Sequence, residues 1–274
     1  MFPPKRIVCL TEETVETLYL LGEDHRIVGV SGYAVRPPQV RREKPRVSAF
    51  ISADIPKILA LEPDLVLTFS DLQAAIVADL IKAGVAVHAF NQRDIAGIFE
   101  MIRTLGALVG AAQKADRLTA TLETRLTQTR ERTSRIEIKP RVYFEEWDDP
   151  MISGIRWVSE LIGIAGGVDV FPELSTRKSA PERVVPARDV IAAEPDIIVG
   201  SWCGKKFVPA KVAAREGFAA IPAVRNGFMR EIKSALILQP GPAALTDGLE
   251  ALAQIVEEWA AFQGRASRPI ASAR

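Results

Sequence analysis

Residues 58–67 are Ile58-Leu59-Ala60-Leu61-Glu62-Pro63-Asp64-Leu65-Val66-Leu67, and residues 190–199 are Val190-Ile191-Ala192-Ala193-Glu194-Pro195-Asp196-Ile197-Ile198-Val199. In both stretches an apolar segment ends at a proline, which cannot continue a helix. An aspartate and an apolar run rich in β-branched residues follow, as expected of a buried strand. The sequence therefore predicts the same helix-to-strand unit in each half of the chain.

The first part of the chain alternates short β-branched runs with helical patterns. This alternation is typical of βα units and mostly parallel sheets. The predicted strands are 6–10, 26–30, 64–69 and 85–90, and the predicted helices are 13–21 and 53–61. These elements form a first βα lobe over residues 1–110.

The segment 94–135 stays compatible with a helix over most of its length, with Gly106 and Gly110 as its only soft breaks. Its second part is rich in Ala, Leu, Arg, Thr and Glu, with leucines at i, i+4 spacing. We therefore expect residues 111–137 to form one long, stiff connecting helix.

A second βα lobe is predicted over residues 138–274. Its expected strands are 141–146, 196–199 and 228–232, its expected helices are 155–164 and 242–262, and its polar tail 263–274 is expected to fray. The predicted fold class is α/β: two βα lobes with mostly parallel central sheets, joined by one long connecting helix, with a ligand cleft between the lobes.

The composition excludes several kinds of protein. The 35 Lys and Arg nearly balance the 34 Asp and Glu, so no electrostatic attraction to nucleic acid is expected. Cys9 and Cys203 lie far apart and the only histidines are His25 and His88, so the spacing of a protein-built metal site is missing. A bound metal would have to arrive inside its own chelate.

Four motifs carry a family resemblance: Arg6-Ile7-Val8-Cys9-Leu10-Thr11, Val28-Gly29-Val30-Ser31-Gly32-Tyr33, Glu146-Trp147-Asp148-Asp149-Pro150 and Gln239-Pro240-Gly241-Pro242. Together with the two Glu-Pro-Asp stretches, they resemble the vitamin B12 (cobalamin or corrinoid) branch of the substrate-binding proteins of ABC transporters, within the periplasmic metal-chelate-binding family. The resemblance implies a non-catalytic binding protein for a large chelate, expected to be cobalamin or another corrinoid. Haem and ferric siderophores are the alternative ligands. Both ABC-type uptake and intracellular corrinoid handling stay open.

The candidate ligand-binding residues follow predicted strands, because ligands of open α/β sheets bind at the carboxyl ends of the strands. Aromatic rings would lie against a flat macrocycle and small polar groups would meet its rim. The candidates are Tyr33, Phe50, Phe69, Trp147, Ser153, Trp202 and Cys203. Each has a structural alternative: Phe50, Phe69 and Cys203 could belong to the core, whereas Trp202, between Ser201 and Cys203, has no periodic reason to be buried. Ser31, Ser201 and Gly204 are further candidates for polar contacts, and Lys205 and Lys206 could meet an anionic group or be solvated.

An enzyme is the alternative from a different functional class. Glu145, Glu146, Asp148 and Asp149 form an acidic cluster that could transfer protons. The sequence has no Gly-x-Ser-x-Gly motif, no phosphate-binding glycine loop and no histidine beside a candidate nucleophile. We therefore expect no catalysis.

The resemblance also implies a permease partner, which would bind one acidic residue on each lobe. The corresponding positions fall near Ala74 and Leu238, which are apolar, although Asp71 or Glu231 could replace them. The four apolar residues 7–10 are too few for a signal peptide. The family predicts a periplasmic monomer, and Met1 as a native start would instead predict a cytoplasmic one.

Overall fold

Arg6, which directly precedes the first strand of the chain, holds the first Glu-Pro-Asp stretch in place through hydrogen bonds. Its backbone N–H donates to Asp64 Oδ1 at 2.9 Å, and the Asp64 N–H donates back to the Arg6 carbonyl at 2.9 Å. The Arg6 Nε donates to the carbonyl of Leu61, which directly follows a helix that ends at Ala60, at 3.0 Å. This bond satisfies a carbonyl that a helix end otherwise leaves without a partner. Glu62 then turns the chain with a left-handed φ of 46°.

Arg141 repeats this arrangement in the second stretch. Its backbone N–H donates to Asp196 Oδ2 at 2.9 Å, the Asp196 N–H donates to its carbonyl at 2.8 Å, and its Nε donates to the Ala193 carbonyl at 2.9 Å. Glu194 has a φ of 41°, close to that of its counterpart. We call each set of bonds an Arg–Asp clamp. The predicted repeat of the helix-to-strand unit is confirmed down to its hydrogen bonds.

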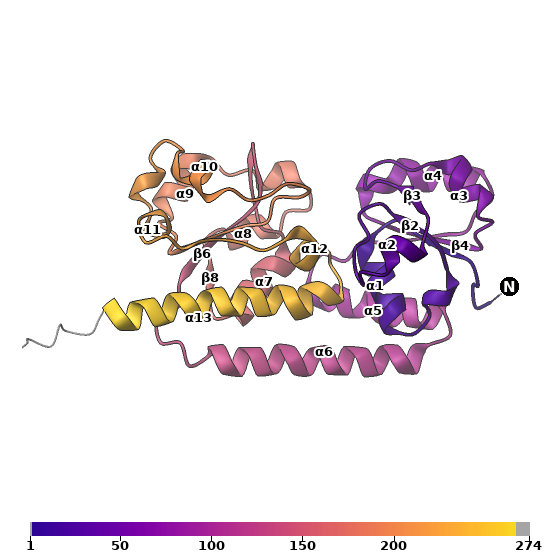
Figure 1. The fold of residues 1–274 in the computed structure, drawn as a ribbon, viewed down its shortest axis with the longest axis horizontal. Helices are drawn as coiled ribbons and strands as arrows, with labels where there is room; N and C mark the ends of the chain where they lie inside the picture. Colours follow the sequence, from indigo (N-terminus) through magenta and orange to yellow (C-terminus); the bar gives the residue numbers. More distant parts are fainter. Residues whose placement is uncertain (1, 267–274) are drawn as a thin grey trace, which may run out of the picture. The chain divides into compact units, whose positions relative to one another are not determined.

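The computed structural model describes residues 2–266, which fall into two compact units. The first unit reaches Glu123 and includes Gln239–Ala243, and the second comprises Thr124–Leu238 and the chain from Ala244 onward. The boundary between the two units falls within α6 (Ala112–Thr133), which Figure 1 shows as one unbroken helix.

The first unit contains a parallel sheet with strand order β3-β2-β1-β4-β5. Its strands are β1 (Ile7–Cys9), β2 (Ile27–Ser31), β3 (Arg46–Ser48), β4 (Leu65–Phe69) and β5 (Val87–Phe90), and its helices are α1 (Glu12–Leu20), α2 (Val40–Glu43), α3 (Ile55–Ala60), α4 (Ala74–Lys82) and α5 (Ile95–Leu108). The four predicted strands are confirmed. Sequence reasoning missed β3, because Val47 is the only apolar residue among its three.

The second unit has a mixed sheet. Strands β10, β9, β6 and β7 are neighbours in that order, and β8 also pairs with β6. Only the β6–β7 pair is antiparallel. The strands are β6 (Arg141–Asp148), β7 (Met151–Ser153), β8 (Val168–Asp169), β9 (Ile197–Gly200) and β10 (Met229–Glu231). The predicted strands β6, β9 and β10 are confirmed, and β7 and β8 were missed.

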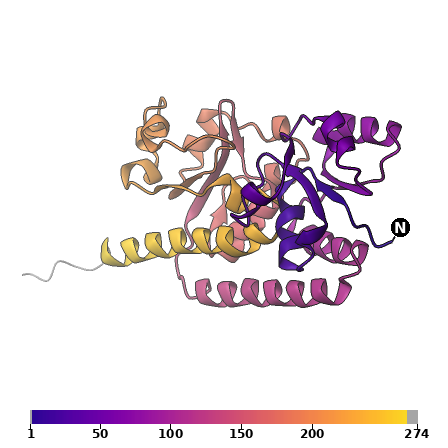
Figure 2. The ribbon, with the colours of Figure 1, turned by 45° about the vertical axis from the view of Figure 1, so that its right-hand side comes forward.

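Helices of several lengths connect the strands of the second unit. They are α7 (Arg156–Ile164), α8 (Pro172–Ser175), α9 (Ala187–Ala192), α10 (Pro209–Ala213), α11 (Pro222–Arg225), α12 (Ser234–Ile237) and α13 (Leu249–Ala266), with a π-helical turn at Ala244–Gly248 before α13. Figure 2 shows α13 in yellow as an unbroken helix. It extends four residues beyond its predicted end at residue 262, so residues 263–266 do not fray as expected. The remaining expected tail, 267–274, lies outside the described residues.

The helix-compatible segment 94–135 is divided at the glycine that the sequence marks. Asp94 caps α5 by accepting from the Gly97 N–H at 2.8 Å. Gly110, with a φ of 74°, then separates α5 from α6, because a residue with a β-carbon is strained in that conformation. Within the second unit, Arg132 of α6 pairs with Glu250 and Glu257 of α13 at 3.0 and 2.9 Å. Among the described residues, none of the helices combines the length and apolarity needed to cross a membrane.

Candidate functional site

Three loops at the carboxyl edge of the first sheet each expose a large apolar side chain. Tyr33 after β2 is 53% exposed, Ile51 after β3 is 71% exposed and Leu72 after β4 is 59% exposed. All strands of this sheet are parallel, so the three loops leave the sheet at the same edge. A contiguous exposed apolar patch marks an interaction site, so these three side chains at one edge are the candidate binding surface of the first unit. We call these three residues the apolar edge.

Gln73 holds this edge together from beneath. Its buried amide donates to the Leu10 carbonyl at 3.2 Å and to the Phe50 carbonyl at 2.8 Å, and its Oε1 accepts from the Phe69 N–H at 3.0 Å. One side chain thereby bonds to a carbonyl that follows β1, to a carbonyl that follows β3 and to the N–H of the last residue of β4. Gln73 thus fixes the loops that follow β3 and β4, which carry Ile51 and Leu72. Sequence reasoning missed Gln73, although a glutamine closely following a strand end is the available signal.

Phe50 and Phe69 were predicted as ligand contacts with core packing as the alternative. Phe69 is 6% exposed and has the Arg93 guanidinium 5.4 Å from its ring centre, so it packs inside the unit. Phe50 is half-buried. Tyr33 is the most exposed of the predicted aromatics in this unit, and its N–H donates to the hydroxyl of the buried Ser31 at 3.2 Å.

Trp147 lies within a hairpin and does not follow a strand as predicted. Strand β6 continues through Asp148 and turns antiparallel into β7. The half-buried indole donates its Nε1–H to the Asp149 carbonyl at 2.9 Å. Lys205 Nζ lies 3.9 Å from the ring centre and is paired with Asp148. One face of Trp147 is therefore covered by an ammonium group.

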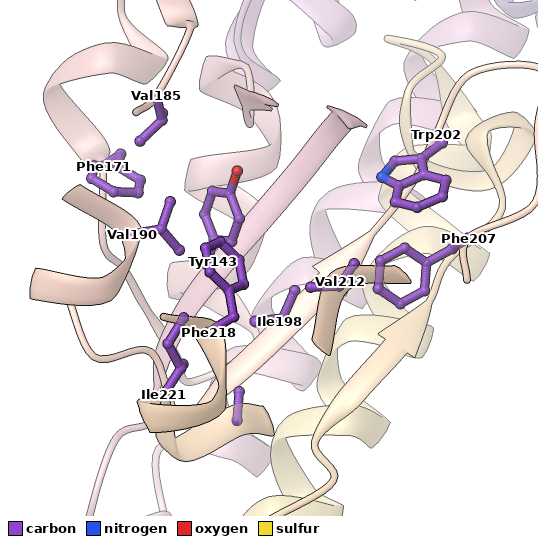
Figure 3. Close-up of a cluster of buried hydrophobic side chains, with 11 residues drawn as sticks. Tyr143, Phe171, Val185, Val190, Ile198, Trp202, Phe207, Val212, Phe218 and Ile221 are labelled. Carbon is purple, nitrogen blue, oxygen red and sulfur yellow. The ribbon is translucent and has the colours of Figure 1, made fainter. Parts of the chain in front are cut away.

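Trp202 is buried, contrary to the prediction that it has no reason to be. It is 3% exposed and belongs to a hydrophobic cluster in which its ring meets that of Phe207 edge to face at 5.0 Å. Figure 3 shows the two rings side by side. Its Nε1–H donates to the carboxylate of Glu145 at 2.9 Å. The partners are 57 and five residues away, so local periodicity could not reveal this burial.

The small candidates of the second unit differ in exposure. Ser153 is buried, and its hydroxyl donates to the Arg183 carbonyl at 3.2 Å. Ser201 is 1% exposed, and its hydroxyl has no hydrogen-bond partner among the residues described. Cys203 is exposed. Of these three residues, only Cys203 presents its side chain at the surface.

A pocket of about 370 Å³ lies at the carboxyl ends of β9 and β10. We call it the lysine pocket, because three of its eight lining residues are lysines. The lining residues are Trp202, Gly204, Lys205, Lys206, Glu231, Ile232, Lys233 and Ser234. The pocket is built entirely within the second unit.

A family model described as a periplasmic binding protein matches residues 7–236. The chain belongs to the periplasmic binding protein family. Its relatives include an uncharacterized ABC transporter substrate-binding lipoprotein of Bacillus subtilis, which is 26% identical over 92% of this chain and 80% of its own length. A protein of Halobacterium salinarum named as cobalamin-binding is 26% identical over 87% of this chain and 66% of its own length.

A solved structure shows the same fold as this periplasmic binding protein. The periplasmic haem-binding protein RhuT of Roseiflexus, in its apo form, superimposes with a TM-score of 0.79 over 92% of this chain and 99% of its own. The two sequences are 24% identical. The predicted fold class, with its two mostly parallel sheets, is thereby confirmed. The predictions of a non-catalytic substrate-binding protein and of an extracytoplasmic family are also confirmed.

The acidic cluster of this periplasmic binding protein is occupied by structural bonds. Glu145 is 0% exposed and accepts from both guanidinium nitrogens of Arg215, at 2.6 and 2.9 Å, as well as from Trp202 and from the Tyr143 hydroxyl. A buried carboxylate needs such donors to stay charged. Glu145 therefore has no lone pair left for proton transfer, which agrees with a binding protein.

Glu146 and Asp148, two of the other three acidic residues of the cluster, are also paired. Glu146 binds the buried guanidinium of Arg183, with Oε1 3.2 Å from Nη2. Burial tends to raise the pKa of Asp148, but its bond to Lys205 outweighs this effect, and the pKa lies below its ordinary value. Sequence reasoning missed Arg183 and Arg215, whose partners are distant in the chain.

The binding protein holds two further carboxyl groups that sequence reasoning missed. Glu12 and Glu13 begin α1 directly after β1 and are 5% and 1% exposed. Burial raises the pKa of Glu12 to about 7 and that of Glu13 to about 8. Thr11 donates to Glu13 Oε1 at 2.6 Å. Both groups therefore change charge near neutral pH.

No three His, Cys, Asp or Glu side chains of residues 2–266 are grouped so as to hold a metal ion. His88 packs edge to face on Phe90 at 4.3 Å, and burial lowers its pKa. Cys9 is buried in β1, and burial raises the pKa of its thiol to about 12. Cys9 is therefore part of the packed interior of the first unit, and His88 is a half-buried strand residue that packs on Phe90.

Proposed function

We propose that this periplasmic binding protein binds a large metal chelate, namely cobalamin or another corrinoid, through the apolar edge of its first unit. The observation that carries the proposal is the exposure of Tyr33, Ile51 and Leu72 on three loops at one edge of the sheet. Gln73 fixes the loops of Ile51 and Leu72, and the Tyr33 N–H is bonded to the hydroxyl of Ser31. A macrocycle with apolar faces gains free energy when such side chains cover it. A prearranged surface also loses little conformational entropy on binding.

The corrinoid is favoured over other chelates by the relative from Halobacterium, which is named for cobalamin binding. Haem is the second candidate, because a haem-binding protein has the same fold. Of the residues predicted from sequence, Tyr33 on the first unit and Trp147 and Cys203 on the second remain proposed ligand contacts. The other predicted residues remain in the proposal as side chains that support the loops carrying these contacts. They are Phe50, Phe69, Ser153 and Trp202.

The test is a calorimetric titration of the purified protein with cyanocobalamin and cobinamide, with haemin and a ferric siderophore as comparators. Saturable binding of a corrinoid at micromolar or tighter affinity, with weaker comparators, is the expected result. Binding of haemin alone would move the protein to the haem branch. Binding of none of the four would refute the proposal.

We further infer that the protein delivers its ligand to an ABC permease outside the cytoplasm. A relative that is named as an ABC transporter substrate-binding lipoprotein supports this inference. Asp71 and Glu231 are exposed acidic residues on different units, and they are the candidate docking groups. Asp71 lies after β4 with its Oδ1 3.2 Å from Arg93. Asp71→Asn and Glu231→Gln should each weaken capture of the protein by a permease encoded beside it. Unchanged capture in the double variant would exclude this docking mode.

A further inference from the structure

The lysine pocket carries an excess of positive charge. Lys205, Lys206 and Lys233 line it against one carboxylate, that of Glu231. The Glu231 Oε1 accepts the Phe207 N–H at 3.1 Å, so this carboxylate is directed to the backbone. The remaining acidic residue nearby, Asp148, is paired with Lys205.

The three lysines are not equivalent. Lys205 is held over Trp147, lies 5.5 Å from the Trp202 ring centre, and is neutralised by Asp148. Lys206 and Lys233 are exposed, and neither ammonium group has an ion-pair partner among the described residues. Two unpaired ammonium groups are therefore available in one pocket.

The rest of the lining suits a small oxyanion. Ile232 is 2% exposed and Trp202 is 3% exposed, so these two buried side chains give the pocket a fixed apolar side next to its lysines. Ser234 adds a hydroxyl donor. Gly204, with a φ of 75°, forms the turn that leads into Lys205 and Lys206, and the Lys205 N–H closes it onto the Trp202 carbonyl at 3.3 Å.

We propose that the lysine pocket binds a phosphate or carboxylate group, with Lys206 and Lys233 as its cationic contacts. In the context of the proposed function, on which this inference rests, the group is an anionic substituent on the periphery of the chelate. Free inorganic phosphate offers the same chemistry as a separate ligand. The pocket would thus select among corrinoids by charge, since cobalamin carries a phosphodiester that cobinamide lacks.

The experiment compares three proteins by calorimetry: the wild type, the pocket variant Lys206→Gln/Lys233→Gln, and the control variant Lys57→Gln/Lys211→Gln. The control removes the same charge from exposed lysines outside the pocket. The pocket variant should bind cobalamin about tenfold more weakly, with cobinamide affinity unchanged. The control should match the wild type. The salt dependence of cobalamin binding should also become shallower in the pocket variant only.

Equal losses for both corrinoids, or an equal loss in the control variant, would overturn the inference. If the wild type binds no corrinoid, the proposed function fails, and the pocket is then tested with inorganic phosphate and pyrophosphate as probes. Binding of either probe that the pocket variant loses and the control retains would support the pocket. Absence of binding to both probes would refute it.

Discussion

Lys205 Nζ lies 3.9 Å from the ring centre of Trp147, and it pairs with Asp148 from the same hairpin. The ammonium group occupies the ring face that a flat ligand would otherwise cover. A cation over an indole contributes about 0.5–1 kcal/mol at an exposed site. Any ligand that uses this face must therefore displace Lys205.

A double-mutant cycle should detect this contact. We expect Lys205→Met and Trp147→Leu to show a coupling free energy of about 0.5–1 kcal/mol in urea unfolding. The control cycle replaces Lys205→Met with Lys206→Met, because Lys206 makes no ring contact among the described residues. Equal coupling in the two cycles would mean that the stacking does not stabilise the protein.

Trp202→Ala should lower the free energy of unfolding by about 3–5 kcal/mol, as large aromatic truncations in a core do. The change removes packing against Phe207 and one of the donors to the buried Glu145. Trp147→Ala, at a half-buried position, should cost less than half as much. Denaturant unfolding of both variants measures the difference, and similar costs would contradict the assignment of Trp202 to the core.

Stability should fall as the pH rises through the range in which Glu13 ionises. The folded protein holds the pKa of Glu13 near 8, compared with an ordinary 4.5, because the carboxyl is buried. Because this pKa is raised in the folded state, the contribution of Glu13 to the free energy of unfolding is complete below pH 4.5. The contribution decreases between pH 4.5 and about pH 8, by at most about 1.4 kcal/mol per pH unit.

Glu13→Gln should flatten this part of the pH profile and stabilise the protein at pH 8, since an amide keeps the acceptor for Thr11 and never ionises. Glu100→Gln, at an exposed helix position, is the control and should leave the profile unchanged. Thermal unfolding at pH 5, 6.5 and 8 measures both. A Glu13→Gln profile parallel to that of the wild type would show that Glu13 does not titrate in this range.

Gln73→Met should destabilise the protein by about 2–4 kcal/mol, because it leaves two carbonyls and one N–H without partners at about 1 kcal/mol or more each. Hydrogen exchange of the Phe69 amide should accelerate by more than global destabilisation explains. Gln128→Met, on the exposed face of α6, is the matched control. Unchanged exchange at Phe69 would show that Gln73 does not fix the loops.

Tyr33→Ala should weaken chelate binding by about 1–2 kcal/mol, as is usual for an aromatic anchor, with no change in unfolding. Ile138→Ala is the control, because this side chain is 66% exposed and precedes the amino end of β6. Calorimetry with the corrinoid that binds most tightly measures both variants. Equal effects would remove Tyr33 from the proposed contacts.

Local patterns were sufficient for most of the scaffold. The β-branched runs predicted β1, β2, β4 and β9, because buried parallel strands are apolar throughout. They failed for β3, β7 and β8, which are two or three residues long. The end of α5 was predictable because Gly110 adopts a conformation that favours glycine.

The candidate site was harder to predict, because it depends on contacts between distant residues. Tyr33 could be proposed from the sequence because it closely follows a predicted strand, and the structure shows that its side chain is exposed. Trp202 was misjudged because its burial depends on Glu145 from another strand. Gln73 and Arg215 escaped notice for the same reason, since each bonds to groups far away in the sequence. Ile51 and Leu72 were passed over because an isolated aliphatic residue in a loop carries no pattern.

The two Arg–Asp clamps lie at the amino ends of β1 and β6, whereas the apolar edge and the lysine pocket lie at the carboxyl ends of their sheets. Substitutions in the loops at the carboxyl ends therefore leave the hydrogen bonds of the two clamps unchanged. A corrinoid receptor and a haem receptor could descend from one ancestor by exchanging only the residues on that far edge. For the protein engineer, the same separation makes loop grafting between relatives a practical route to new chelate specificities.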